Sequence, residues 1–163
     1  MDEALVRFLA DTGCRIGAAC SLEVGAINMD QCNALVHEKG GRFVRVFFTP
    51  PTRKGLSAWI RQRPACEHDF VFISRLGNPL APRVARQHLT RVGEAAGVEH
   101  VYPCRFRPTV GRRWALAGVP LTATARKLNH QNPHTTARYY QNMDEDDVRR
   151  FTDELGFDQA ADA

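Results

Sequence analysis

The sequence predicts an α+β domain that is mainly helical and has a small antiparallel three-stranded sheet. Two observations carry this prediction: apolar residues recur at helical spacing near both ends of the chain, and three short strand-like runs lie between them. Helices, then strands, then further helices is an order typical of α+β folds. The 163 residues are enough for one domain with a hydrophobic core, and too few for two.

Two helices are expected before the sheet. The first covers residues 2–11, where Asp2 is the expected N-cap and apolar side chains follow at spacings of three and four residues. It ends at Gly13, a residue typical of helix C-termini. A second, shorter helix is expected over residues 15–22.

The expected strands cover residues 26–29, 34–37 and 43–49. The last two are separated by Lys-Gly-Gly-Arg, in which Gly40 and Gly41 supply the positive φ angles of a tight hairpin. The sheet is expected to end at Pro50-Pro51, because proline cannot donate to a strand ladder.

The helices expected after the sheet cover residues 52–63, 83–96, 108–117, 122–128, 134–141 and 144–157. In the second of these, Val84, Leu89 and Val92 are expected to form the apolar side. Pro108 is placed in the first turn of the third, where its missing N–H is harmless.

Composition narrows the class of protein. No apolar run reaches the roughly 20 residues needed to span a bilayer, and no signal segment opens the chain. The five cysteines form no paired or zinc-like spacing, which is typical of reduced thiols in a cytoplasmic protein. We therefore expect no metal, no other cofactor and no membrane partner.

Charge is distributed unevenly along the chain. The formal net charge is +4, but residues 142–163 carry eight acidic residues against two arginines, which leaves +10 on the rest. Only three of the 22 basic residues are lysines. Arginine binds phosphate oxygens in pairs, which lysine cannot do. A GC-rich coding sequence also accounts for an arginine excess. The positions of the arginines, and not their number, therefore have to show whether they bind phosphate.

Five polar side chains lie at turns or element ends, where functional groups are often displayed. They are Arg15 after Thr12-Gly13, Lys39 at the hairpin tip, Arg107 before Pro108, and His130 nine residues before Tyr139. Taken singly, each has an ordinary structural explanation, such as a solvated arginine or a histidine at a helix end. Their joint order along the chain favours a functional interpretation.

That order resembles the catalytic domain of the tyrosine recombinase (phage integrase) family. The first motif is TGCRIGAACSLEVGAINMD and the second is PCRFRPTVGRRWALAGV, which supply the two arginines Arg15 and Arg107. EKGGRFVRV is similar to the family's lysine hairpin and supplies Lys39. LNHQNPHTTARYY is similar to the pattern that ends in the nucleophile, which places His130 and Tyr139. The resemblance covers about residues 4 to 142.

The resemblance implies metal-independent cleavage and religation of duplex DNA through a 3′-phosphotyrosyl intermediate. Tyr139 would be the nucleophile, with Tyr140 as the alternative, and Lys39 would protonate the departing 5′ oxygen. The two arginines would stabilise charge on the phosphate oxygens, and His130 would hydrogen-bond the phosphate. Further phosphate contacts are expected from arginines near the hairpin, a helix start and the second motif: Arg42, Arg45, Arg83, Arg86 and Arg105.

The chain departs from the family pattern at four positions in the motifs. Two of them, Asn129 for the glycine before His130 and Pro108 for a frequent histidine, are expected to be tolerated, and the other two bear on the chemistry. Cys104 stands where the second motif usually has histidine, and a thiol is a poorer proton shuttle and hydrogen-bond donor. Ala18 stands where an acidic residue often follows the first arginine, which removes the expected orienting partner of Arg15. Cleavage is therefore expected to be slow. A catalytically impaired DNA-binding or accessory protein, or relaxation of supercoils by the same chemistry, stay open as alternatives.

One catalytic domain is expected over residues 1–157, with 144–157 as its C-terminal helix and 158–163 as a frayed tail. The chain begins close to the first motif, so the family's N-terminal core-binding domain is expected to be absent. Duplex DNA is the expected partner, in the cytoplasm and associated with the nucleoid. A homo-oligomer on DNA is expected to form through residues 145–157, although packing of this helix on its own chain explains its apolar stripe equally well.

Overall fold

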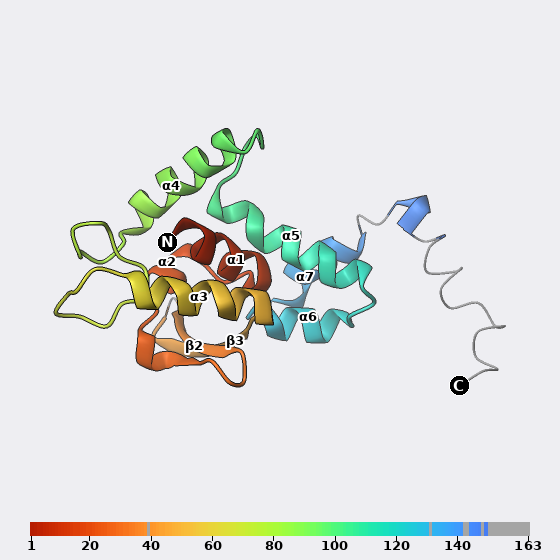
Figure 1. Cartoon of the computed structure of the whole chain (residues 1–163). Coiled ribbons are helices and arrows are strands. Elements are labelled where there is room, and N and C mark those ends of the chain that lie inside the picture. The colour runs from red at the N-terminus through yellow and green to blue at the C-terminus, as the bar shows by residue number, and fades with distance from the viewer. Residues whose placement is uncertain (39, 131, 142–143, 148, 150–163) are drawn as a thin grey trace.

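In the computed structural model of the chain, which describes residues 1–38, 40–130, 132–141, 144–147 and 149, a small sheet lies at one side of the helices (Figure 1). In chain order the elements are α1 (Asp2–Thr12), α2 (Ile16–Cys20), the 3-10 turn η1 (Val24–Ala26), β1 (Ile27–Asn28), β2 (Asn33–Glu38), β3 (Arg42–Phe47), α3 (Pro50–Gln62), α4 (Pro82–Ala95), α5 (Pro103–Leu116), α6 (Leu121–Lys127) and α7 (Pro133–Gln141). The predicted fold class, mainly helical with a three-stranded antiparallel sheet, is confirmed.

Helix α1 supplies the centre of the core and contacts α3, α4 and α5. Its residues Leu5, Phe8 and Leu9 are fully buried, because the helical spacing places them on one face. The ring of Phe8 lies 6.1 Å from those of Phe48 and Phe72, which come from later parts of the chain. In Figure 1 the sheet lies on one side of the pair α1 and α3, and α4 lies on the opposite side of that pair. Helices α5, α6 and α7 lie beside them.

The sheet has the order β1-β2-β3, and both pairs of neighbours are antiparallel. Strand β2 is the central strand, and Ala34, Val36 and Glu38 on its inward face are buried. Gly40 and Gly41 have φ angles of 91° and 76°, as expected for the hairpin. Strand β2 includes one residue more than predicted at its end, so Glu38 belongs to the buried face and not to the turn.

Helix α3 begins at Pro50, so the two prolines lie in its first turn and not before it. The start of α3 is tied to the end of α1 by Asp11, whose Oδ2 accepts hydrogen bonds from the Thr49 hydroxyl and the Thr52 hydroxyl, both at 2.6 Å. The Thr49 backbone N–H donates to the same oxygen at 2.8 Å. These three hydrogen bonds hold the end of α1 against the start of α3.

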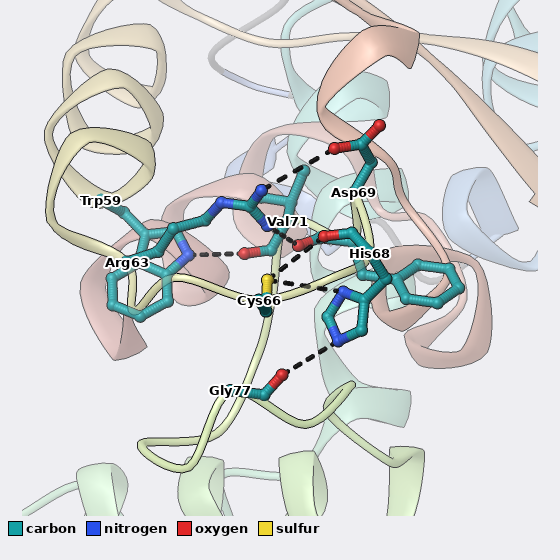
Figure 2. A network of polar contacts seen from close by, with 8 residues as sticks. Trp59, Arg63, Cys66, His68, Asp69, Val71 and Gly77 are labelled. Carbon is teal, nitrogen blue, oxygen red and sulfur yellow. Dashed lines mark hydrogen bonds and ion pairs between the residues drawn. The ribbon is translucent and has the colours of Figure 1, made fainter.

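The long connection between α3 and α4 is held by side-chain bonds to backbone carbonyls, as Figure 2 shows. Trp59 of α3 donates its Nε1–H to the Val71 carbonyl at 2.7 Å. His68 Nε2 lies 2.9 Å from the Gly77 carbonyl. These bonds fix a segment that has few backbone partners of its own, and they position the apolar run that begins at Phe70 against the core.

Helix α4 packs with a face turned by one residue from the one predicted, although Leu89 is buried as predicted. Ala85, Leu89 and Gly93 are buried, whereas Val84 is 38% exposed. The chain near Val101 approaches Gly93 so closely that an added Cβ would lie 2.6 Å from the Val101 side chain. The prediction followed the large apolar residues, but close packing here uses the small ones, which turns the inward face by one residue.

Helix α5 begins at Pro103, five residues earlier than predicted, and contains Pro108 in its interior. Pro103 occupies the first turn, the position that was predicted for Pro108. Pro108 has no N–H to donate to the Cys104 carbonyl, so α5 lacks one bond there and still continues. Arg107 therefore does not open the helix but lies within its second turn.

Other differences are small. Asp2 is the first residue of α1, whose N-cap is Met1. Of the predicted C-terminal helix, residues 145–147 and 149 are helical and Asp144 is not, whereas its remaining positions and the predicted tail over 158–163 lie outside the described residues. None of the described helices combines the length and apolar character that a bilayer crossing requires.

Candidate active site

A cleft of about 710 Å³ lies where the start of α2, the end of β2 and the start of α5 meet. Three arginines line it, Arg15, Arg86 and Arg107, together with Cys104. These residues come from distant parts of the sequence, and the fold of α1 against α5 brings them together. A concave surface with converging guanidinium groups is suited to binding an anion.

Gly13 shapes the floor of this site. It adopts the left-handed conformation with φ +60°, and its N–H donates to the Leu9 carbonyl at 2.9 Å, which ends α1. A Cβ at this position would lie 2.8 Å from Leu128 Cδ2. The turn therefore requires glycine for both its backbone conformation and its close packing. It also directs the Gly13 carbonyl toward the Arg107 guanidinium.

Arg107 is held by hydrogen bonds from all three of its nitrogens. One terminal nitrogen donates to the Gly13 carbonyl at 2.9 Å, the other donates to the Leu128 carbonyl, and Nε donates to His130 Nε2 at 3.2 Å. Burial and then the nearby Arg15 charge lower the Arg107 pKa to about 10, so the group stays charged at neutral pH. Guanidinium carries five N–H donors, and these bonds leave one on each terminal nitrogen for a ligand.

His130 is neutral and has a defined tautomer. Its Nε2 accepts the bond from Arg107, so the ring proton lies on Nδ1, which is 2.7 Å from the hydroxyl of buried Thr136. Burial, followed by the charges of Arg107 and Arg15, lowers the His130 pKa to about 4. In the free protein His130 therefore positions Arg107, and its hydrogen bond to a phosphate stays a prediction.

The depressed His130 pKa makes the stability of the fold depend on pH. The unfolded chain protonates this histidine near its ordinary value of 6.5, but the folded chain does so only near 4. The unfolded state thus binds more protons in this window, and the His130 contribution is lost as pH falls from 6.5 toward 4. We expect the melting temperature of wild type to fall more steeply over this range than that of His130→Asn.

The matched control is His134→Asn, which changes an exposed histidine in the same part of the chain. Its melting temperature should follow that of wild type at every pH, since both retain His130. If the difference in melting temperature between wild type and His130→Asn stays constant from pH 7 to pH 4.5, the lowered pKa of His130 is contradicted.

The Tyr139 ring packs against α5 at a position that only glycine allows. A Cβ on Gly111 would lie 2.3 Å from Tyr139 Cε2, and the centre of the Tyr139 ring is 6.1 Å from that of His130. Burial raises the Tyr139 pKa, although the charge of Arg107 opposes this. Without DNA, Tyr139 is thus a neutral phenol beside a cationic site.

Tyr140, the alternative nucleophile, has its hydroxyl engaged within the fold. It donates to the Val119 carbonyl and lies 2.8 Å from the Thr124 hydroxyl. These contacts tie α7 to α6 and to the chain that precedes it. Tyr140 is therefore explained by packing, whereas the Tyr139 ring lies beside His130 and lines a cavity along α5, not the cleft of Arg15 and Arg107.

Arg15 has an acidic partner that the sequence did not reveal. It is the N-cap residue of α2, and its guanidinium forms an ion pair with the carboxylate of Glu38 at the end of β2. Glu38 is only 4% exposed. The pair lies beside Ala18, the position where the resemblance led us to expect the acidic residue.

The structure places the remaining candidates on the surface. Cys104 is exposed and lies in the same cleft as Arg15 and Arg107. The arginines named as phosphate contacts are all exposed: Arg42, Arg45, Arg83, Arg86 and Arg105. Of these, Arg86 lies in the cleft with Arg15 and Arg107, and Arg105 contacts the Tyr102 ring. Lys39 lies outside the described residues.

Within the described part of the chain, no three His, Cys, Asp or Glu side chains gather closely enough to hold a metal ion. Sequence reasoning missed Gly111, Thr136 and Glu38, each of which supports one candidate side chain. For Glu38 a signal was present, because the alternation of Ala34 and Val36 places the next inward position at residue 38.

Known proteins share this fold and are similar in sequence. The model of the phage integrase family matches residues 1–146, and the chain belongs to this family of tyrosine recombinases. It is 27% identical over 146 residues to tyrosine recombinase XerC of Bacillus subtilis, with 85% of this chain and 48% of the relative covered. The corresponding protein of Corynebacterium efficiens is 26% identical over 140 residues, with coverages of 85% and 45%.

Solved structures confirm the fold. The crystal structure of XerA recombinase superimposes with a TM-score of 0.83 at 21% identity and covers 93% of this chain and 56% of that one. The XerH site-specific recombinase bound to its difH substrate gives a TM-score of 0.75 at 18% identity, with coverages of 93% and 45%. The chain thus spans about half the length of the relatives it matches.

Proposed function

We propose that this chain is the catalytic domain of a site-specific DNA recombinase that cleaves and rejoins strands through Tyr139 without a metal. One observation carries the proposal: Arg107 lines the cleft with Arg15 and donates a hydrogen bond to His130, whose ring centre lies 6.1 Å from that of Tyr139. The printed title of one similar structure, XerH, describes a site-specific recombinase bound to its DNA substrate.

The proposed reaction is a transfer of the phosphoryl group between two oxygens. The Tyr139 hydroxyl loses its proton to solvent as its oxygen attacks phosphorus, and the bond from phosphorus to the 5′ oxygen breaks. Lys39 supplies the proton that this oxygen needs. Arg15 and Arg107 hold the non-bridging oxygens, on which charge accumulates in the transition state. The reverse reaction rejoins the strand, because the phosphotyrosyl link preserves the energy of the bond.

Duplex DNA would lie across the cleft and the hairpin. Arg42 and Arg45 lie on β3, Arg83 and Arg86 at the start of α4, and Arg105 next to the cleft residues on α5. These exposed guanidinium groups would contact phosphates, and binding through them weakens as salt rises. A DNA substrate in a bacterial cell would place the protein at the nucleoid.

Assembly on DNA is a further part of the proposal. Recombination needs two duplexes to meet, and we propose that copies of the chain associate through residues 145–157. The described start of this segment contacts its own chain, because Asp147 Oδ2 accepts a bond from Arg112 at 2.8 Å. This contact ties the start of the segment to α5, and we propose that its later residues reach a neighbouring copy.

The test is the capture of a covalent complex. The chain is incubated with a pool of nicked duplexes that carry a randomised core, and complexes are isolated under denaturing conditions. Cleavage releases a short piece of DNA between the cleaved bond and the nick. This piece carries the free 5′ hydroxyl and diffuses away, so that cleavage cannot be reversed. We expect wild type to yield a covalent adduct on a recurring sequence with a chelator present. Specific DNA binding without any adduct would contradict strand cleavage by this chain.

The alternative, a catalytically impaired DNA-binding protein, is favoured by Cys104. Its thiol lies in the cleft at the position of the usual histidine, where it would donate only weakly to a phosphate. Replacement Cys104→His is expected to raise the adduct rate by about 10²-fold, the low end of the contribution of a placed acid or base. Equal rates for the two proteins would show that the thiol is sufficient, and no adduct from either would favour the alternative.

A further inference from the structure

Glu38 is a buried acid that the proposed reaction does not use. It is the last residue of β2 and shares the inward face of that strand with Ala34 and Val36. Its side chain is 3% exposed. A carboxylate this deeply buried is stable as an anion only next to a counter-charge, because it has lost its hydration.

The counter-charge is Arg15, which lies at the mouth of the cleft. The two side chains form an ion pair, and the Arg15 side chain is 47% exposed although its partner is not. One end of the guanidinium is thus attached to a rigid strand and the other faces the cleft. A long arginine side chain loses conformational entropy when it is ordered. The ion pair with Glu38 orders Arg15 before DNA binds, so this entropy is not lost during binding.

Helix α2 itself has no acidic residue that could pair with Arg15. Ala18, one turn after Arg15, is 3% exposed and lines the same cleft. Arg86 and Arg107 line it as well, so several guanidinium groups are gathered there and repel one another. A negative charge in the wall of the cleft lowers this repulsion.

We propose that Glu38 is the positioning residue of Arg15, and that it supplies from β2 the carboxylate that Ala18 cannot supply from α2. Glu38 does not touch the reacting phosphate and acts through the guanidinium. This inference rests on the proposed function in so far as Arg15 binds that phosphate. The ion pair itself can be tested without DNA.

The first measurement follows the pair directly. Phenylglyoxal modifies arginine side chains, and mass spectrometry gives the rate at each position. In Glu38→Gln we expect Arg15 to react about fivefold faster, the factor lost when an ion pair of this kind no longer shields it. The double variant Ala18→Glu/Glu38→Gln should return the rate toward wild type. An Arg15 rate that is unchanged in Glu38→Gln would overturn the proposal.

The second measurement follows the reaction. Glu38→Gln is expected to form the covalent adduct about 10- to 100-fold more slowly, as a small misplacement of a binding group does. The double variant Ala18→Glu/Glu38→Gln should recover most of this loss. Glu94→Gln, which changes an exposed acid on α4, is the matched control and should cleave like wild type.

A methylphosphonate at the cleaved position separates positioning from general damage to the fold. This substrate has one charged oxygen fewer, so a well-placed Arg15 contributes less to its cleavage. We expect the defect of Glu38→Gln to shrink to a few-fold on methylphosphonate. An equal defect on both substrates would overturn the proposal, because it would indicate a structural role. If wild type gives no adduct, the proposed function fails, and the labelling result alone decides whether Glu38 holds Arg15.

Discussion

A Tyr139→Phe variant is expected to form no covalent complex with DNA, although it still binds the same duplex. Phenylalanine keeps the ring that packs on Gly111 and beside His130, so the fold and the seat of the side chain are preserved. It lacks only the oxygen that would attack phosphorus. The loss should be complete and not partial, because a covalent intermediate cannot form without the nucleophile. The measurement is adduct yield on a denaturing gel, alongside binding in a mobility-shift assay.

Tyr140→Phe is the matched control, since it removes a hydroxyl from the neighbouring residue. This variant should still form the adduct, but it should melt at a lower temperature, because the Val119 carbonyl and the Thr124 hydroxyl each lose a partner. The reverse pattern, in which Tyr139→Phe forms adduct and Tyr140→Phe does not, would transfer the nucleophile to Tyr140.

An Arg107→Lys variant should lose about 10²- to 10³-fold in the rate of adduct formation, as removal of one transition-state donor does. Lysine keeps the positive charge but cannot hold the Gly13 and Leu128 carbonyls while it also offers paired donors to a phosphate. His130 Nε2 also loses its donor. Single-turnover rates at saturating protein measure this effect apart from binding.

Arg113→Lys serves as the control, because Arg113 is an exposed arginine on the same helix. It should cleave at a rate close to that of wild type. Arg107→Lys is also expected to melt at a lower temperature, since each half-buried carbonyl left without a donor costs about 1–3 kcal/mol. Wild-type cleavage by Arg107→Lys would show that the guanidinium is not used and would contradict the proposed site.

Local patterns were sufficient for most of the fold. Helical spacing located α1 within one residue, and two consecutive glycines located the hairpin between β2 and β3. Errors arose where packing and not local preference decides. Pro103 begins α5, so that Pro108 falls inside the helix and not at its start. Helix α4 faces the core with Ala85 and Gly93, because the chain near Val101 approaches it closely.

The candidate site shows the same division. The motifs identified Arg15, Arg107, His130 and Tyr139 by their types and spacing, but not the groups that hold them. Thr136 was invisible as the partner of His130, since six residues of sequence do not reveal which hydroxyl meets which ring nitrogen. The pKa of His130 likewise depends on burial and on two arginines from other helices.

What the sequence by itself determined is the family and the fold class, and it predicted the residue types of a phosphate-binding site, because these follow from local spacing and from the chemistry of individual side chains. What only the tertiary structure decided is the set of partners. Glu38 lies 23 residues after Arg15 and is the last residue of β2, yet its carboxylate pairs with that guanidinium beside Ala18. Such pairs depend on how strand and helix pack in space, since charges interact across distance and not along the chain.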